Sequence, residues 1–315
     1  VTRILEARST QFLLLTLFIL GAILCVFTPN YFLFKWGESF AMYIMFGYLL
    51  GGLVFLFFSK PKMMFTSFAC CAGLALYLKD ASNGNLVYPA RTSAPAVSVA
   101  NFNLSASNEN FIGTTEAILK EGADVVSVQE IDPNWQSILD DALKVEYPYS
   151  AVVFRPENFQ GIGIYSRTPL TVVDTFYFED VPNLKFKIEM AEQEVCLMSA
   201  YIYPEFNTED YARKQQHLDA LCHNLEWEEV PFITMGDFNE VQWSGYIRDF
   251  RRTCQLSDSR RFPTWVKRPT DHIFYSRHFE CVAFKSITTN NTTHLGISGT
   301  YQFHTPLIDV ETAAQ

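Results

Sequence analysis

Charged residues are scarce in the first part of this chain. Residues 1–94 contain seven Lys or Arg and three acidic residues, whereas the whole 315-residue chain contains 24 basic and 34 acidic residues. A soluble domain needs a polar surface, and no stretch between the apolar runs of this region is polar enough to form one. The scarcity of charge therefore disfavours a soluble N-terminal domain and favours a membrane region.

An excess of basic charge is missing from the rest of the chain. Residues 1–94 have a net charge of +4, so the overall −10 leaves −14 for residues 95–315. Non-specific binding of nucleic acid depends on clustered Lys and Arg side chains that neutralise phosphates. The acidic balance therefore disfavours bulk nucleic acid as a partner, although it leaves room for a local basic patch.

Cysteine spacings typical of metal motifs are also missing. Of the seven cysteines, three lie in the apolar N-terminal runs and four lie beyond them. The latter are Cys196, Cys222, Cys254 and Cys281. Two interpretations remain open for these four. They are buried free thiols, which we favour, or they form disulfides in an oxidising compartment.

What fills the N-terminal part is three apolar runs, residues 12–27, 40–58 and 63–78. A membrane span needs roughly 20 apolar residues, so the second run suffices alone and the outer two suffice with their flanks. Buried core helices and signal peptides are the alternatives for runs of this length. We predict three transmembrane helices and hence a lipid bilayer as a partner. Gly47 and Gly51, followed by Gly52, mark a candidate helix contact in the second run.

Loop charges predict the orientation in that membrane. With three spans, the N-terminal tail and the loop at residues 59–62 lie on one side, and they carry Arg3, Arg8, Lys60 and Lys62. Cytoplasmic loops are enriched in Lys and Arg. The large C-terminal part is therefore expected on the non-cytoplasmic side.

Strand and helix patterns alternate after a linker at residues 80–96. Short apolar runs predict strands, and stretches with an apolar stripe predict helices. The predicted strands are residues 97–104, 124–130, 149–154, 161–166, 195–203 and 232–235, and the predicted helices are residues 108–122, 133–144 and 210–225. Strands mixed with helices at this density indicate a layered α/β domain over residues 97–315.

Polar side chains stand at the ends of several predicted strands. The apolar strand at residues 232–235 breaks at Gly236 and is followed by Asp237, Phe238 and Asn239. In an extended chain, Asp237 and Asn239 point to one side and Phe238 to the other. A carboxylate beside an amide suits a phosphate held near a metal ion. An ordinary Asp/Asn turn is the alternative.

Eight short motifs occur in the order that is typical of one superfamily. They are residues 101–104 (NFNL), 128–131 (VQEI), 163–167 (GIYSR), 199–204 (SAYIYP), 236–239 (GDFN), 263–265 (PTW), 271–274 (DHIF) and 304–307 (HTPL). With them, the chain resembles the endonuclease/exonuclease/phosphatase superfamily over about residues 95–310. The resemblance implies a four-layer α/β sandwich, with two mixed sheets face to face and helices outside.

The resemblance also implies roles for individual residues. Glu130 resembles the principal Mg²⁺ ligand of the family, with Asn103 beside it, and Mn²⁺ is the alternative ion. Such ions prefer oxygen ligands and, for Mg²⁺, only one or two carboxylates. Asp237 and Asn239 resemble the residues that orient the attacking water and hold the phosphate. Asp271 resembles the carboxylate that orients the catalytic histidine, here His304.

Two residues depart from the family pattern. Tyr201 stands where many members have His, although the branch that resembles abasic-site endonucleases has Tyr in a similar setting. Phe303 stands before His304 where the usual Ser-Asp-His ending has Asp. Because that Asp lies near the metal in the family, Phe303 predicts a weakened metal site.

These observations predict a membrane-anchored, Mg²⁺-dependent phosphoesterase that hydrolyses a phosphodiester or phosphomonoester. The acidic charge and the anchor favour a lipid headgroup or a small soluble phosphoester over bulk DNA. The alternative is an inactive member of the family that is a structural subunit of a membrane complex and contacts its partners through the three helices.

Overall fold

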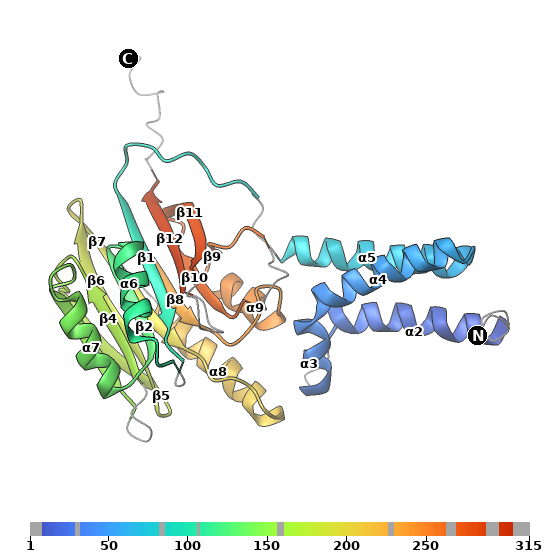
Figure 1. Cartoon of the computed structure of the whole chain (residues 1–315), viewed down its shortest axis with the longest axis horizontal. Coiled ribbons are helices and arrows are strands. Elements are labelled where there is room, and N and C mark those ends of the chain that lie inside the picture. The colour runs from blue at the N-terminus through green and yellow to red at the C-terminus, as the bar shows by residue number, and fades with distance from the viewer. Residues whose placement is uncertain are drawn as a thin grey trace, which may run out of the picture.

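The computed structural model describes residues 8–28, 32–81, 86–105, 108–155, 161–225, 230–262, 269–287 and 296–304. These residues form a helical extension and an α/β domain, and the extension projects from the domain beside α9 (Figure 1). Residues 86–95 contain no helix or strand and lead from the extension to the first strand.

The described part of the extension contains four helices. They are α2 (Arg8–Val26), α3 (Phe32–Ser39), α4 (Ala41–Phe57) and α5 (Pro61–Asp80). The predicted apolar runs correspond to α2, α4 and α5, and α3 is a helix that the sequence analysis did not predict. Pro61 begins α5, where a missing N–H costs nothing because the first helical N–H groups have no partner within the helix.

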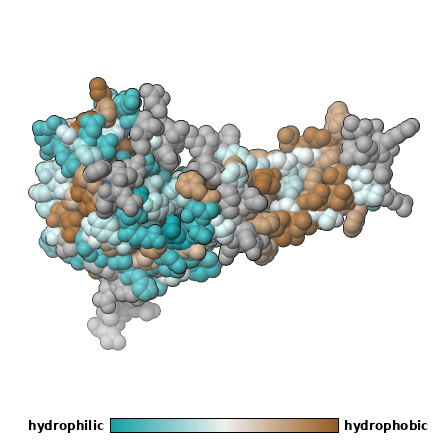
Figure 2. All heavy atoms as spheres, turned by 90° about the horizontal axis from the view of Figure 1, so that it is seen from below, coloured by the Kyte–Doolittle hydropathy of each residue, from teal (hydrophilic) through white to brown (hydrophobic). Residues whose placement is uncertain are grey.

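Within the part of the chain that the structure describes, two helices, not three, are both long and apolar enough to cross a membrane. They are α2 and α5, whereas α4 is apolar but has only 17 residues. Figure 2 shows hydrophobic side chains gathered over the extension and a mostly hydrophilic domain surface. Buried core helices and signal sequences meet the same criterion of length and composition. The prediction of three spans is therefore supported for two of them only.

Small residues of α4 do form a helix contact, but not at every predicted glycine. A Cβ atom added at Gly52 would lie 2.4 Å from the Phe68 ring of α5, and one at Gly51 would lie 3.2 Å from Ser67 Oγ. At Gly47 it would meet nothing within 4 Å among the described atoms. The close contact of α4 with α5 therefore lies at Gly51 and Gly52.

The domain contains two six-stranded mixed sheets. The first has the order β11 (Phe279–Ile287), β12 (Gly296–Phe303), β1 (Ala96–Asn103), β2 (Val125–Ile131), β4 (Gly161–Ser166) and β3 (Tyr149–Phe154). The second has the order β5 (Val172–Phe178), β6 (Val181–Met190), β7 (Gln193–Tyr201), β8 (Phe232–Asp237), β10 (Asp271–Tyr275) and β9 (Ser257–Asp258). The pairs β1/β2 and β7/β8 are parallel, and the other described pairs are antiparallel.

Helices cover the outer face of each sheet. The first sheet packs against α6 (Phe111–Glu121) and α7 (Pro133–Leu143), and the second against α8 (Thr208–Asn224) and α9 (Gly245–Thr253). An apolar core that includes Val99, Ile164, Leu197 and Met235 fills the space between the sheets. This arrangement of layers confirms the predicted two mixed sheets flanked by helices.

One disulfide corrects the preference for free thiols. Cys222, near the end of α8, is bonded to Cys254, which follows α9, with a Cα–Cα distance of 5.5 Å. Cys196 and Cys281 are buried free thiols. Disulfides persist in oxidising compartments, so the bond agrees with the expected non-cytoplasmic side.

A buried histidine on α8 gives the domain an acid-sensitive stability. Asn183 Nδ2 donates to His217 Nε2 at 3.2 Å, and the ring stacks on Phe178. Burial lowers the pKa of His217 to about 3. In the unfolded chain the same imidazole titrates near its ordinary value of about 6.5. Stability from this group is therefore fully present above pH 6.5 and is lost as the pH falls toward 3.

His217→Gln should reduce this acid sensitivity. Between pH 7 and pH 5 the His217 term should lower the free energy of unfolding of the parent by about 2 kcal/mol, and the variant should lack this loss. Chemical denaturation at the two pH values measures the difference. His223→Gln, an exposed position on the same helix, is the matched control. An equal pH dependence in parent and His217→Gln would show that His217 does not carry it.

Candidate active site

Five of the seven predicted site residues meet because of strand direction. Asn103 is the last residue of β1. Glu130 is the second-to-last residue of β2, which runs parallel to β1. Tyr201 and Asp237 are directly paired at the ends of the parallel strands β7 and β8. Asp271 begins the antiparallel strand β10 and pairs with Asp237. Both sheets therefore deliver polar side chains to one edge of the sandwich.

Asn103 connects the two sheets at this edge. Its Nδ2 donates to Glu130 Oε1 at 3.0 Å and to Asp237 Oδ2 at 3.1 Å. Its Oδ1 accepts from the backbone N–H of Ser105 at 3.0 Å, which fixes the amide. Two carboxylates from different sheets thus converge on one side-chain amide.

Glu130 is aimed at the site by a β-bulge. Gln129 pairs with Ile162 and Ile131 pairs with Gly161, so Glu130 is the residue inserted at the bulge. Its φ of 57° is left-handed, which is costly for a residue with a side chain. Bulges of this kind redirect side chains next to active sites.

The turn after β8 holds Asn239 in a second left-handed conformation, with φ of 49°. Its backbone N–H donates to Asp237 Oδ1 at 2.8 Å, and its Nδ2 donates to the Ile202 carbonyl at 2.7 Å. Phe238 is fully buried, as predicted. Asp237 and Asn239 thus share the site, but through a turn and not through the predicted strand alternation.

Gly236 allows the two sheets to approach behind the site. A Cβ atom there would lie 1.7 Å from the Ala200 carbonyl oxygen and 2.7 Å from Gln129 Nε2. In this space Gln129 donates to Ala200 O at 2.5 Å and accepts from the Asp237 N–H at 2.8 Å. Gln129 is a supporting residue that the sequence analysis missed.

Gly236→Ala should therefore destabilise the domain by about 3 kcal/mol or more, because the Ala200 backbone and the Gln129 side chain would both have to move. Thermal unfolding of the full chain in detergent measures the change. Gly73→Ala is the control, since a Cβ atom there meets nothing within 4 Å among the described atoms. A variant as stable as the control would contradict the close approach.

Burial sets the protonation of two site residues. Burial, followed by the charges of Asp237 and Glu130, raises the pKa of Asp271 well above its ordinary value. Asp271 Oδ1 is buried and has no hydrogen-bond partner among the described residues. Burial, followed by the charges of Glu130 and Asp237, also raises the pKa of Tyr201. Tyr201 therefore remains a hydrogen-bond donor throughout the physiological pH range.

A buried lysine that the sequence analysis missed supports the turn. Lys214 on α8 is 2% exposed, and its Nζ donates to the Asn239 carbonyl at 2.9 Å. It also forms ion pairs with Glu205 and Glu240. Its position on a helix, far from the motifs in the sequence, gave no signal of this contact.

A third missed residue is Arg155, which lines a small hollow with Glu130, Gly161 and Tyr201. Its guanidinium pairs with Asp180 and lies 4.6 Å from the centre of the Tyr203 ring. Arg155 brings positive charge next to a cluster of carboxylates.

The structure does not bring His304 to this edge. Gln302 pairs with Ala96, at the beginning of β1, and His304 N–H donates to the His278 carbonyl at 3.0 Å. Because β1 has eight residues, this place is about 23 Å along the strand from Asn103. The predicted pair of Asp271 with His304 is therefore wrong.

Phe303 lies at the same distant end. Its ring packs 4.8 Å from that of Phe279, and its N–H donates to the Pro95 carbonyl. The prediction that Phe303 weakens the metal site is therefore wrong as well, because Phe303 is not near the site.

Another histidine is close in sequence to the beginning of β12, which is the end of that strand nearest Asn103. The strand begins at Gly296, and Ile297 pairs with Asn101 near the end of β1 that carries Asn103. Only Leu295 separates Gly296 from His294 in the sequence. His294 lies outside the described residues. The direction of β12 is the signal that favours His294 over His304 as the histidine of the site.

The donor set at this edge fits a hard divalent cation. Among the described residues, no three acidic, His or Cys side chains lie close enough together to hold a metal alone. Mg²⁺, however, takes one or two carboxylates and keeps several waters. Glu130 and Asp237, which both accept from Asn103 Nδ2, supply two carboxylates and so meet that requirement, with a buried, unpartnered oxygen of Asp271 on the neighbouring strand.

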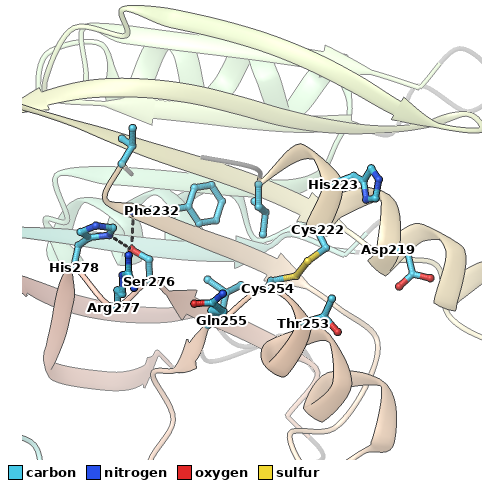
Figure 3. A pocket seen from close by; sticks show the side chains of 13 residues that line it. Asp219, Cys222, His223, Phe232, Thr253, Cys254, Gln255, Ser276, Arg277 and His278 are labelled. Atoms are coloured by element: carbon cyan, nitrogen blue, oxygen red, sulfur yellow. Dashed lines mark hydrogen bonds between the residues drawn. A yellow bond between two sulfur atoms is a disulfide. The ribbon is translucent and has the colours of Figure 1, made fainter. Parts of the chain in front are cut away.

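A larger cavity lies elsewhere in the domain. It has a volume of about 560 Å³ and lies beside Phe232, at the beginning of β8, whereas Asp237 ends that strand (Figure 3). The Cys222–Cys254 disulfide lines it, and the Ser276 hydroxyl accepts from the Phe232 N–H on its other side. This cavity is separate from the candidate active site.

Comparison with known proteins agrees with this geometry. Three solved structures each align with a TM-score of 0.55. D. rerio TDP2 complexed with single strand DNA product is 14% identical and aligns over 66% of this chain and 99% of its own. The human Nocturnin catalytic domain with bound sulfate anion is 16% identical and aligns over 69% of this chain and 96% of its own. An endonuclease/exonuclease/phosphatase from Beutenbergia cavernae is 16% identical and aligns over 66% of this chain and 72% of its own.

At these identities the structures support a shared fold alone. No curated protein matches the chain significantly. The family assignment depends on a sequence profile that matches residues 100–291, well over half of the chain. The chain belongs to the Endonuclease/Exonuclease/phosphatase family, and thus to the phosphoesterase-type hydrolases.

Proposed function

We propose that this protein is a membrane-anchored, Mg²⁺-dependent phosphoesterase. The observation that carries the proposal is the convergence of Glu130 and Asp237 on Asn103, with a buried carboxyl oxygen of Asp271 behind them. Two residues have a left-handed backbone here, Glu130 within the cluster and Asn239 next to it. Such strain persists where surrounding structure enforces it, and it concentrates at functional sites.

In this proposal each residue has a distinct role. Glu130 and Asn103 hold the cation, with Asp237 beside them; when bound, Mg²⁺ neutralises negative charge that builds on the phosphoryl oxygens. Asp237 orients the attacking water and accepts its proton. Tyr201 and the Asn239 amide hold the phosphate in place. Asp271 retains a proton to higher pH than usual, which limits the negative charge of the cluster.

A histidine completes the site in the proposal, and His294 is our candidate. An imidazolium near the phosphoryl group stabilises the charge of the transition state and can protonate the leaving group. His294 is two residues before the strand that begins beside the end of β1.

For the substrate, we favour a lipid headgroup or a small soluble phosphoester. The net charge of −14 over residues 95–315, which follows from the composition, disfavours a long phosphate backbone. Arg155 supplies local positive charge beside Glu130 and Tyr201. The neighbours with a sulfate anion and with a single strand DNA product support binding of an oxyanion and keep DNA as a substrate to be tested.

We further propose that α2, α4 and α5 all cross the membrane and that the domain lies on the non-cytoplasmic side. The Cys222–Cys254 disulfide and the basic loops on the opposite side support this orientation. Protease added outside sealed cells or spheroplasts should degrade the domain. Complete protection would contradict the orientation.

A substrate panel tests the proposed activity. The purified full chain should hydrolyse bis(p-nitrophenyl) phosphate or p-nitrophenyl phosphate slowly and phospholipid in mixed micelles faster, in each case only with Mg²⁺ or Mn²⁺. Faster cleavage of single-stranded DNA than of either would assign a nuclease. No turnover of any substrate with either ion would favour the alternative, a structural subunit that contacts its partners through the helices.

A further inference from the structure

The helical extension contacts the domain through a buried acidic residue. Glu38, at the end of α3, accepts from Trp243 Nε1 with its carbonyl at 2.8 Å and from the Gly245 N–H with Oε1 at 2.7 Å. Its Oε2 accepts from Lys35 Nζ at 3.1 Å. Tyr77 of α5 donates to the Trp243 carbonyl at 2.8 Å. We call Glu38, Tyr77, Trp243 and Gly245 the helix dock.

This contact is well sealed. Glu38 is 3% exposed, Trp243 is 1% exposed, and Tyr77 is 7% exposed. Trp243 and Val241 pack with apolar side chains from α4 and α5, which are Ala41, Met42, Leu74 and Leu78. Hydrogen bonds to a carboxylate are roughly twice as strong as neutral ones, and they are strongest where water is excluded.

Two arginines of α9 add to the same contact. Arg251 Nη1 donates to the Ala81 carbonyl, just after α5, at 3.1 Å, and the Arg248 guanidinium lies 5.0 Å from the centre of the Tyr77 ring. Glu38 also acts at the first turn of α9, where a carboxylate stabilises the free N–H groups and the positive end of the helix dipole. The dock therefore fixes the beginning of α9 to the extension.

A short connection joins the beginning of α9 to the turn at Asp237–Asn239 in the candidate active site. Residues 238–244 connect Asp237, the end of β8, to Gly245, the beginning of α9. Asn239 lies within this connection in its left-handed conformation. Asparagine adopts that conformation more readily than most residues with a side chain, and it keeps it where the surrounding structure enforces it. Strand β8 holds the Asp237 side, and the packed Val241 and Trp243 hold the other.

We propose that the helical extension is a positioning element for the active site, with Glu38 and Trp243 as positioning residues that hold the Asp237–Asn239 turn. The inference concerns a contact between segments about 200 residues apart in the sequence. Its effect on rate depends on the proposed phosphoesterase activity, but its effect on the turn does not.

The dock shares this task with bonds inside the domain. Lys214 donates to the Asn239 carbonyl, and Gln242 Nε2 donates to the Arg260 carbonyl at 2.9 Å. The His272 ring bonds the Glu240 carbonyl at 2.9 Å. Because these restraints remain when the dock is weakened, we expect a partial loss of activity and not its abolition.

Two conservative variants of the full chain test the inference. Glu38→Gln keeps the shape but removes the charge that pairs with Lys35, and Trp243→Phe removes only the Nε1 donor and part of the ring. Hydrogen exchange should become about tenfold faster for the Asn239 amide, which bonds Asp237 Oδ1, and for the Gly245 amide. The kcat for p-nitrophenyl substrates should fall about tenfold with KM nearly unchanged, because a misplaced turn impairs the transition state more than substrate binding.

Controls and outcomes separate the two claims. Glu116→Gln, at an exposed position on α6, should match the parent in both readouts. Unchanged exchange at Asn239 in both variants would overturn the positioning role, as would faster exchange with unchanged kcat in an active enzyme. If the parent has no turnover, the proposed function fails, and the exchange data alone decide whether the extension holds the turn.

Discussion

Glu130→Gln should lower kcat on the order of 10³-fold at saturating Mg²⁺, because it removes the ligand charge that the bulge of β2 directs into the site. The amide of Gln is a poor substitute for a carboxylate as a ligand of a hard cation. The apparent Mg²⁺ requirement should also rise. Steady-state hydrolysis over a Mg²⁺ titration measures both effects.

The same variant should fold at least as stably as the parent. Glu130 adds negative charge beside Asp237 and contributes to the raised pKa of Asp271. Removing that charge relieves repulsion in the metal-free protein, so the thermal midpoint without metal should stay or rise. Glu116→Gln is the matched acid-to-amide control. Unchanged turnover at limiting Mg²⁺ would remove Glu130 from the metal site.

His294→Ala and His304→Ala should differ sharply. We expect His294→Ala to lower kcat about 10³-fold, within the range that a lost acid, base or charge-stabilising group produces. His304→Ala should change kcat less than about twofold, because β12 carries His304 to the opposite end of the first sheet from Asn103.

The pair is a direct test of strand direction in the site. Both variants replace a histidine by alanine, and both positions flank the same strand, one before Gly296 and one after Phe303. A large loss with His304→Ala and none with His294→Ala would restore the original motif assignment and contradict the pairing of β12 with β1.

Local patterns were sufficient for much of the fold. The strands predicted at residues 149–154 and 161–166 match β3 and β4 in their bounds, and Gly122 ends α6 in a left-handed conformation. These elements depend on alternation, β-branched residues and glycine caps, which are properties of neighbours in the sequence. Polar residues at strand ends identified Asn103, Glu130 and Asp237 for the same reason, whereas Asp271 was identified only by the resemblance of its motif to the family.

The errors come from information that is not local. A short motif pointed to His304, and only the direction of β12 relative to β1 points to His294 instead. The pairing of Cys222 with Cys254 depends on how α8 and α9 pack. Glu38 gave no signal because its partners, Trp243 and Gly245, follow some 200 residues later.

Hydrolysis in ¹⁸O-labelled water is the most direct test of the central claim. The claim is that the site at Asn103, Glu130 and Asp237 uses a divalent cation to promote attack of water on the phosphorus atom. With Mg²⁺ and p-nitrophenyl phosphate or its diester, the account predicts one ¹⁸O atom per turnover in the phosphorus-containing product and none in p-nitrophenol. Chelation by EDTA should stop the reaction and added Mg²⁺ should restore it, in the parent but not in Glu130→Gln. Release of product that persists in EDTA, or label in the phenol, would contradict the account.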